Sequence, residues 1–340
     1  MNKLIFPKNF YWGAATSSHQ VEGDNHNDWS EWETKDLRFK IDDVRFKNWS
    51  DDILKKYPNP LAQENYISSQ ACDHYHRFEQ DFDLAQSLNH NAHRFSIEWS
   101  RIEPQEGQFD ENEIRHYQKV ISALKARNLE PFITLWHWTN PTWFAEKKGF
   151  LKKENIKYFV RFVSYCANHF KNAKFFIILN EPNIYTLNSY LRGLWPPQKT
   201  SFVESIEVYL NLIQAHQESY DAIKRINNQA LVGIAKNNSY FEIAKPSLIN
   251  KTFKKMADYF WNHYFLEKIS DELDFIGLNY YFHTKINISL LHSPQKWFSQ
   301  NKNGVVSDLG WEIYPKGIYE VLKDLKKYGK LIYITENGLA

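Results

Sequence analysis

Short apolar runs alternate along the chain with longer segments in which apolar residues recur every three or four positions. The runs are rich in β-branched and aromatic residues and predict strands at residues 10–17, 92–97, 131–135, 175–179, 230–235, 274–278 and 331–335. The longer segments predict helices at residues 73–88, 112–127, 155–170, 202–226, 253–266 and 315–328. The pattern therefore predicts seven strands, each separated from the next by a helix.

The regular alternation of strand and helix indicates the fold class. It is typical of βαβ units, which form a parallel sheet with right-handed crossovers. Because the 340 residues contain no linker rich in proline, glycine or serine, we expect residues 1–340 to form a single α/β barrel domain. A long polar connection at residues 24–71 interrupts the pattern, and loops of this length are usually functional or contain short helices.

Two of the predicted strands end in a carboxylate beside an amide. Asn180 and Glu181 follow the fourth strand, and Glu336 and Asn337 follow the last one. In a parallel barrel the carboxyl ends of the strands meet on the face that carries the active site. Two carboxylates about 5–5.5 Å apart perform retaining glycoside hydrolysis, in which one protonates the departing oxygen and the other attacks the anomeric carbon. The alternative is that Asn180 caps the next turn and Glu181 is solvated, because both residues also suit an ordinary exit from a strand.

Other predicted strand ends carry side chains that can recognise sugars. Amides, imidazoles and carboxylates hydrogen-bond vicinal hydroxyls, and indole rings stack on pyranose rings. Aromatic residues make up 16% of the chain, and we expect most of them in the core. A single histidine or tyrosine after an apolar run is also usually a structural residue. Their joint occurrence at strand ends favours a carbohydrate site. The residues are Gln20, Arg94, Glu98, Trp99, His137, Trp138, Asn180, Lys236, Asn237, Asn238, Asn279 and Tyr281, with the two glutamates.

Charge and cysteine content narrow the class of partner. The 42 basic and 40 acidic residues are interspersed, which argues against nucleic acid or an anionic membrane and favours an uncharged small molecule. Cys72 and Cys166 are too few for a disulfide framework, so we expect free thiols in a reducing compartment. Residues 1–6 contain only a short apolar run, so no signal peptide or membrane span is expected and the protein is predicted to be cytoplasmic.

Histidine pairs are the remaining candidates for a metal site. His74 and His76, and likewise His90 and His93, lack the accompanying carboxylate spacing of known sites. Histidines on a helix surface are the favoured interpretation, so no metal or cofactor is expected. A metal-dependent hydrolase stays an alternative, which activity in the presence of a chelator would test.

Seven segments spread along the chain combine aromatic, acidic and amide residues in a fixed order. They are residues 10–17 (FYWGAATS) with 20–23 (QVEG), 91–101 (NAHRFSIEWSR), 134–138 (TLWHW), 179–183 (LNEPN), 275–281 (FIGLNYY), 310–315 (GWEIYP) and 334–338 (ITENG). Together these segments resemble family 1 of the glycoside hydrolases, the β-glucosidase type.

The resemblance implies a role for each matching side chain. Glu181 matches the acid/base and Glu336 the nucleophile of a retaining β-glycosidase that acts on small β-linked glucosides or galactosides. Arg94 and Tyr281 then flank Glu336 and keep it ionised, while Asn279 supports the same region. The residues implied to hold the hydroxyls of the terminal sugar are Gln20, His137, Trp138 and Asn180, with Asn180 on the 2-hydroxyl.

The same resemblance implies an incomplete barrel. Members of the family continue past the segment at residues 334–338 through an eighth strand and helix, with a Trp-rich motif that grips the outer hydroxyls, whereas this sequence stops at Ala340. We therefore expect a (β/α)8 TIM-barrel type with seven recognisable strands and without the final βα unit, either in a fragment or in a naturally reduced enzyme.

An open barrel side exposes apolar strand edges, which soluble proteins cover. The connection at residues 24–71 could fold over it, the gap could stay partly open, or identical chains could associate there, and we expect a homo-oligomer. The alternative function is a catalytically weak sugar-binding or assembly protein derived from a glycosidase.

Overall fold

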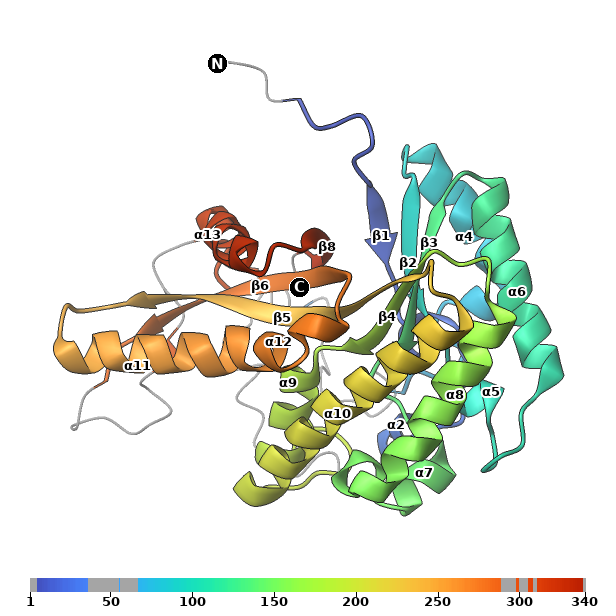
Figure 1. Cartoon of the computed structure of the whole chain (residues 1–340), viewed down its shortest axis with the longest axis horizontal. Helices are drawn as coiled ribbons and strands as arrows, with labels where there is room; N and C mark the ends of the chain where they lie inside the picture. Colours follow the sequence, from blue (N-terminus) through green and yellow to red (C-terminus); the bar gives the residue numbers. More distant parts are fainter. Residues whose placement is uncertain are drawn as a thin grey trace.

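The computed structural model describes residues 5–35, 55, 67–288, 298–299, 305–307 and 311–338. Its central sheet has seven parallel strands and forms a nearly closed barrel (Figure 1). The predicted barrel type and its seven strands are therefore confirmed. In spatial order the strands are β1 (Gly13–Ala15), β2 (Ala92–Ser96), β3 (Glu130–Trp136), β4 (Phe175–Asn180), β5 (Leu231–Ile243), β6 (Phe275–Ile286) and β8 (Leu331–Asn337), and the two-residue β7 (Phe298–Ser299) pairs antiparallel with β6.

Helices between successive strands cover the outside of the sheet (Figure 1). An amphipathic helix of this kind buries its apolar face, as α8 does with Phe159, Phe162 and Val163. Within the described residues no helix is both long enough and apolar enough to cross a membrane. The longer helices are α4 (His74–Ser87), α6 (Glu111–Ala126), α8 (Ile156–His169), α10 (Phe202–Ile226), α11 (Leu248–Asp258) and α13 (Pro315–Leu325). The short ones are α1 (Ser18–Val21), α2 (Asp28–Glu33), α5 (Trp99–Ile102), α7 (Thr142–Glu146), η4 (Gly149–Leu151), η5 (Lys153–Asn155), α9 (Pro182–Thr186), η6 (Leu187–Leu191), η7 (Tyr259–His263), α12 (Tyr264–Lys268), η8 (Ser270–Glu272) and η10 (Lys326–Tyr328).

Two strands are much longer than predicted. The apolar runs predict ends at residues 235 and 278, but β5 continues to Ile243 and β6 to Ile286 as a paired ribbon beside α11 (Figure 1). This correction has a physical reason: the backbone ladder satisfies the peptide groups of the ribbon even where the side chains are polar. The predicted helix at residues 253–266 is likewise wrong in its bounds, because α11 begins at Leu248 and a π-helical turn at Tyr259–His263 separates it from α12.

The first strand is shorter than the predicted residues 10–17, since only Gly13–Ala15 pairs with β2. A Cβ atom at Gly13 would lie 2.3 Å from the carbonyl oxygen of Ala92, so the close approach of these strands requires glycine there. Inside the barrel, at the amino ends of the strands, aromatic rings form a cluster in which Phe132 stacks on Phe175 with ring centroids 4.1 Å apart. This cluster supports the strands below the site.

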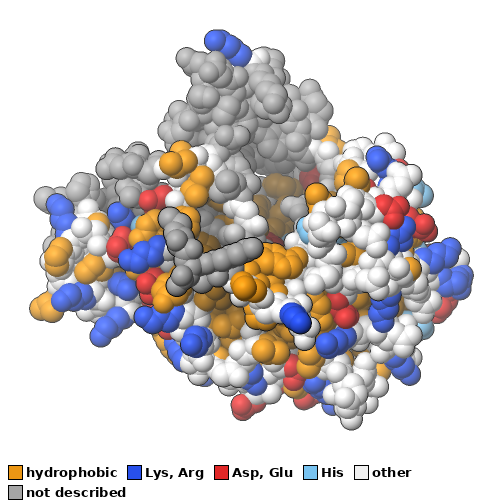
Figure 2. Space-filling model, turned by 90° about the horizontal axis from the view of Figure 1, so that it is seen from above, with side chains coloured by type: hydrophobic (Ala, Val, Ile, Leu, Met, Phe, Trp, Pro, Cys, Tyr) orange, Lys and Arg blue, Asp and Glu red, His pale blue; other side chains and the backbone are white. Residues whose placement is uncertain are grey.

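The barrel is open between β1 and β8, and we call this side the seam. Neither strand pairs with the other in the part of the chain that the structure describes, because β1 pairs with β2 and β8 with β6. Apolar side chains at the seam are exposed, including Trp12 (49%), Leu331 (62%) and Ile334 (46%). Figure 2 shows hydrophobic side chains gathered in the hollow of the face from which the N-terminal segment projects. The expected unsealed barrel is therefore confirmed.

The long connection at residues 24–71 was expected to be functional or to carry short helices. Its described part contains the helix α2 (Asp28–Glu33), which Asn27 caps by accepting hydrogen bonds from the backbone N–H groups of Trp29 and Ser30. Residues 36–54 and 56–66 lie outside the described residues, as does Gly310 of the segment at 310–315. Whether this connection covers the seam therefore stays a prediction.

Candidate active site

A cavity of about 1940 Å³ extends through the open barrel. Glu181 and Glu336 line it at the carboxyl ends of the strands, and it continues along the seam to Phe132 and Leu331 at their amino ends. Parallel α/β barrels carry their active sites at the carboxyl ends. The two glutamates singled out in the sequence therefore share one cavity. Gln20, Arg94, His137, Trp138, Trp195, Asn237 and Tyr281 also line it.

Glu181 occupies a strained backbone conformation between β4 and α9. Its φ of +44° lies in the left-handed region, and Pro182 begins α9 directly after it. The Glu181 N–H donates to the carbonyl oxygen of Ala235, at 2.7 Å, which fixes the turn. Strained residues of this kind concentrate at functional sites, where the surrounding structure holds them in place.

The carboxyl group of Glu181 is buried and accepts two amide hydrogen bonds. The Nδ2 atoms of Asn237 and Asn279 donate to its Oε1 at 3.0 and 2.9 Å. Burial and the nearby charge of Glu336 raise the pKa of Glu181 to about 7, although the two amides and Arg94 act in the opposite direction. A carboxyl group with this pKa retains its proton in a substantial fraction of molecules near neutral pH.

Glu336, at the end of β8, has the opposite electrostatic environment. Its Oε1 lies 2.6 Å from Nη1 of Arg94, and its Oε2 accepts a hydrogen bond of 2.9 Å from the hydroxyl of Tyr281. Burial alone would raise the pKa of Glu336, but the charge of Arg94 and the hydrogen bonds from Arg94 and Tyr281 hold that pKa below its usual value. Near neutral pH, Glu336 is therefore ionised, whereas Glu181 is partly protonated.

Arg94 connects three strands beneath the two glutamates. Besides Glu336, its guanidinium donates to Asn180 Oδ1 at 2.6 Å, to Thr134 Oγ1 at 2.9 Å and to the carbonyl oxygen of Thr335 at 3.3 Å. Its side chain is only 4% exposed. A planar guanidinium with this many partners holds both its own position and that of the carboxylate it pairs with.

Asn180 links the remaining predicted residues to this network. Its Nδ2 contacts Nε2 of His137 at 3.0 Å, and its backbone carbonyl accepts a hydrogen bond of 3.0 Å from the Trp138 indole. Burial lowers the pKa of His137 to about 3, so the imidazole is neutral. The Nδ2 of Asn279 bridges Asn180 Oδ1 at 3.2 Å and Glu181 Oε1 at 2.9 Å. The structure thus brings together all the residues to which the resemblance assigns a role, except one.

The exception is Gln20, which lies on the cavity wall apart from the network. Its side chain is exposed, and its Oε1 accepts a hydrogen bond of 2.8 Å from Ser17. Glu98, also noted at a strand end, does not join the site, because it is buried and accepts hydrogen bonds from Ser18 at 2.9 Å and Ser100 at 2.8 Å. Trp99 lies in the hydrophobic core.

Three further residues contact the network: Asn237, which was predicted only as one of the polar groups at strand ends, and Thr134 and Thr335, which were not predicted at all. Asn237 follows the fifth apolar run, which is the only signal of it in the sequence. In the structure the register of β5 and β6 places it beside Asn279. Thr335 donates to Asn279 Oδ1 at 2.6 Å and so orients the amide toward Glu181. Threonines inside a strand pattern carry no such signal, because they also suit strands for packing reasons.

The histidines noted in the sequence form no common site. His74 and His93 are buried, so their interpretation as helix-surface residues is wrong: His93 lies on β2, where its ring contacts that of Phe82 with centroids 5.2 Å apart. His74 pairs with Asp81 at 2.6 Å. Both cysteines are free thiols, with Cys72 exposed and Cys166 buried.

Comparison with known proteins identifies the family. Glycosyl hydrolase family 1 matches residues 2–270 and 265–340. The 1,4-beta-D-glucan glucohydrolase of Thermotoga neapolitana is 29% identical over 371 residues, which cover 98% of this chain and 82% of that enzyme. Beta-glucosidase A of Thermotoga maritima is 29% identical over 100% of this chain and 80% of its own length. The solved beta-glycosidase from Pyrococcus horikoshii has a TM-score of 0.84 at 34% identity, over 98% of this chain and 77% of that chain. This chain is a glycoside hydrolase and belongs to glycosyl hydrolase family 1.

Proposed function

We propose that the protein is a retaining β-glycosidase that hydrolyses small β-linked glucosides and galactosides through a covalent glycosyl-enzyme intermediate. The observation that carries this proposal is the opposite direction of the pKa shifts of Glu181 and Glu336 within one hydrogen-bonded network. A general acid needs a raised pKa and a carboxylate nucleophile needs a low one. The names of the relatives, beta-glucosidase and 1,4-beta-D-glucan glucohydrolase, support β-glucosides as the substrate class.

In the first step Glu336 attacks the anomeric carbon while Glu181 protonates the departing glycosidic oxygen. Arg94 and Tyr281 each bind one oxygen of Glu336, so they orient the carboxylate and keep it ionised until it reacts. The glycosidic bond breaks, an ester bond to Glu336 forms, and the proton of Glu181 leaves with the aglycone. Glu181 is then a carboxylate.

The second step uses the change of charge produced by the first. Once Glu336 is an uncharged ester, its charge no longer raises the pKa of Glu181, so that pKa falls. The ionised Glu181 removes a proton from water, and this water attacks the anomeric carbon. The sugar departs with its original configuration, Glu336 is again a carboxylate, and Glu181 is again protonated.

The residues that hold the sugar are those implied by the resemblance. We infer that Gln20, His137, Trp138 and Asn180 contact the hydroxyls of the terminal sugar. Asn180 Oδ1 already accepts from Arg94 and Asn279, so its amide nitrogen is the atom left to donate to the 2-hydroxyl. Trp195 lies 4.5 Å from Trp138 between ring centroids and extends the aromatic wall of the cavity.

Proton NMR of the sugar released from an aryl β-glucoside tests this proposal. The β-anomer should appear first, and Glu336→Ala should lower kcat by orders of magnitude. Glu181→Ala should spare substrates with a leaving group that needs no proton. The control is Glu154→Ala, since Glu154 is an exposed glutamate on η5 that does not line the cavity. An α-anomer as first product would contradict the mechanism, and sugar binding without turnover would favour a sugar-binding descendant of a glycosidase.

We further propose that identical chains associate at the seam. Exposed apolar side chains gather there, and Phe6 (55%) and Trp12 (49%) of the N-terminal segment line the same cavity as Leu331 (62%). Glu336 lies on β8, which pairs only with β6 in the described part of the chain. A second chain over the seam would therefore also hold the nucleophile in place. Light scattering and a rate assay across a dilution series test this together. A fully active monomer at nanomolar concentration would contradict it.

A further inference from the structure

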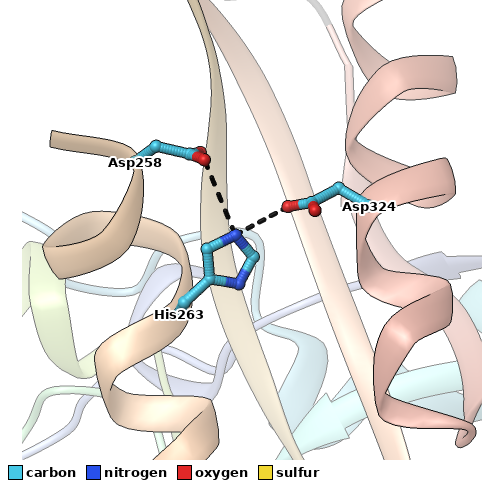
Figure 3. A group of neighbouring side chains, drawn as sticks. All are labelled: Asp258, His263 and Asp324. Carbon is cyan, nitrogen blue, oxygen red and sulfur yellow. Dashed lines mark ion pairs between the residues drawn. The ribbon is translucent and has the colours of Figure 1, made fainter. Parts of the chain in front are cut away.

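Three side chains with metal-binding atoms meet in a cluster, and none of them lines the active-site cavity (Figure 3). Asp258 is the last residue of α11, His263 ends the π-helical turn η7, and Asp324 lies on α13. One ligand atom of each lies within 4.8 Å of the other two. The Nε2 atom of His263 is 2.6 Å from Asp324 Oδ2 and 3.8 Å from Asp258 Oδ2. Two carboxylates from different helices thus converge on one ring nitrogen.

The cluster is closed on the histidine side and open on the aspartate side. The His263 side chain is 4% exposed, whereas those of Asp258 and Asp324 are 38% and 45% exposed. The imidazole is therefore fixed by packing, while the carboxylates can adjust and solvent can reach them. This arrangement allows an ion to enter and water to complete its coordination.

The buried Nε2 atom of His263 makes no hydrogen bond of acceptable geometry within the described residues, although the two carboxylates are close. The neighbouring oxygens therefore lie off the axis of the ring nitrogen. Around a tetrahedral Zn²⁺ ion, bonds of about 2.0–2.2 Å place a ligand oxygen off that axis and about 3.3 Å from the nitrogen. The observed distances of 2.6 and 3.8 Å lie on either side of this value. Shifts of less than about 1 Å in two exposed carboxylates would form the site.

The outer partners of these residues also suit a metal site. His263 Nδ1 contacts the hydroxyl of Tyr328 at 2.9 Å, and when Nδ1–H donates there, the lone pair of Nε2 is free to bind a metal. Asn262 Nδ2 donates to Asp258 Oδ1 at 2.7 Å, which orients that carboxylate. The ammonium group of Lys327 lies 3.8 Å from the other oxygen of Asp324, Oδ1, so it leaves Oδ2 directed at the histidine.

We propose that Asp258, His263 and Asp324 bind one Zn²⁺ ion, with water as the fourth ligand. One imidazole nitrogen and two carboxylate oxygens suit Zn²⁺ better than Mg²⁺ or Ca²⁺, which prefer ligand sets made of oxygen alone. The ion links α11 and η7, which pack on β5, to α13, which leads into β8 beside the seam. It thereby restrains the strand that carries Glu336 on the open side of the barrel.

Titration of tag-free, chelator-treated protein with Zn²⁺ tests the site by calorimetry and by thermal unfolding. We expect one ion per chain and a rise in Tm on the order of 1–3 °C. Both effects should be lost in His263→Gln and Asp324→Asn. The matched control is His76→Gln, since His76 is an exposed histidine that pairs with the single carboxylate of Asp73 at 2.7 Å. This control should keep the full response.

Two further measurements test the zinc site even if His263→Gln or Asp324→Asn folds poorly. Tyr328→Phe retains the ring but removes the outer hydrogen bond, so it should weaken Zn²⁺ binding about 10–100-fold. Co²⁺ in the same site should give the intense visible absorption of a tetrahedral complex, and His263→Gln should lack it. Absence of Zn²⁺ binding, or an equal response in wild type and His263→Gln, would show that the cluster is an ion pair only.

Discussion

Replacing Asn237 by leucine should move the activity of this enzyme to higher pH. Asn237 Nδ2 donates a hydrogen bond of 3.0 Å to Glu181 Oε1, and this bond lowers the pKa of Glu181. Its own Oδ1 has no hydrogen-bond partner within the described residues, so the substitution leaves no second group unsatisfied there. Leucine has nearly the same size, which limits the entry of water into the vacated position.

The magnitude follows from the charge on the acceptor. A hydrogen bond to an ionised group contributes about 1.5–3 kcal/mol, and one pKa unit corresponds to about 1.36 kcal/mol. Removing the bond should therefore raise the pKa of Glu181 by about one to two units. Because the acid must be protonated in the first step, activity is lost as pH rises through this pKa, so a higher pKa moves the alkaline limb upward. In the wild type this limb should lie at about pH 7.

The assay is the pH dependence of kcat/KM on an aryl β-glucoside. The matched control is Asn238→Leu, because Asn238 is the next buried asparagine on β5 but its amide faces the carbonyl oxygen of Asn262 at 3.4 Å. The alkaline limb should move in Asn237→Leu and stay in place in Asn238→Leu. An unmoved limb in the first variant, or equal movement in both, would refute the assignment of Glu181 as the acid.

Two further predictions concern Arg94 and substrate specificity. Arg94→Met should lower the free energy of unfolding, measured with urea, by about 3–5 kcal/mol because it leaves the Glu336 carboxylate without its buried partner. The pKa of Glu336 is lower in the folded protein than in the unfolded chain. The loss of unfolding free energy should therefore be complete at pH values above the pKa of the unfolded carboxyl group, and it should shrink as the pH falls through the pKa of the folded one. An equal loss at acidic pH would contradict this prediction. Apolar residues such as Trp12 and Leu331 line the seam side of the cavity, and they offer no hydrogen bonds to sugar hydroxyls. Each hydrogen bond that is not made removes about 1–3 kcal/mol of discrimination between epimers. Glucosides and galactosides should therefore be turned over with similar kcat/KM. A thousandfold preference for one epimer would contradict this.

The apolar runs predicted buried strands such as β2 and β4 well, because strands buried on both faces must be apolar throughout. The pair of glutamates could also be predicted, since both directly follow such runs. The ends of β5 and β6 could not, because their ribbon is held by backbone pairing that polar side chains do not reveal. The left-handed backbone of Glu181 was equally hidden, since glutamate has no sequence preference for that conformation.

The hydrogen-bond partners within the site depend on strand register, which the sequence does not specify residue by residue. Asn237 and Thr134 reach the glutamates and Arg94 only because β5 and β3 are aligned as they are. The cluster of Asp258, His263 and Asp324 was missed for a similar reason. Its third member comes from α13, so no short motif in the sequence connects it to the histidine.

The most direct test of the two-glutamate mechanism is to trap its intermediate. A 2-deoxy-2-fluoro-β-glucoside with an activated leaving group should inactivate the enzyme, because the fluorine slows the second step more than the first. Mass spectrometry of the peptides should then locate one fluorosugar on Glu336. A sugar attached to another residue, or continued turnover of β-glucosides by Glu336→Ala, would contradict the account.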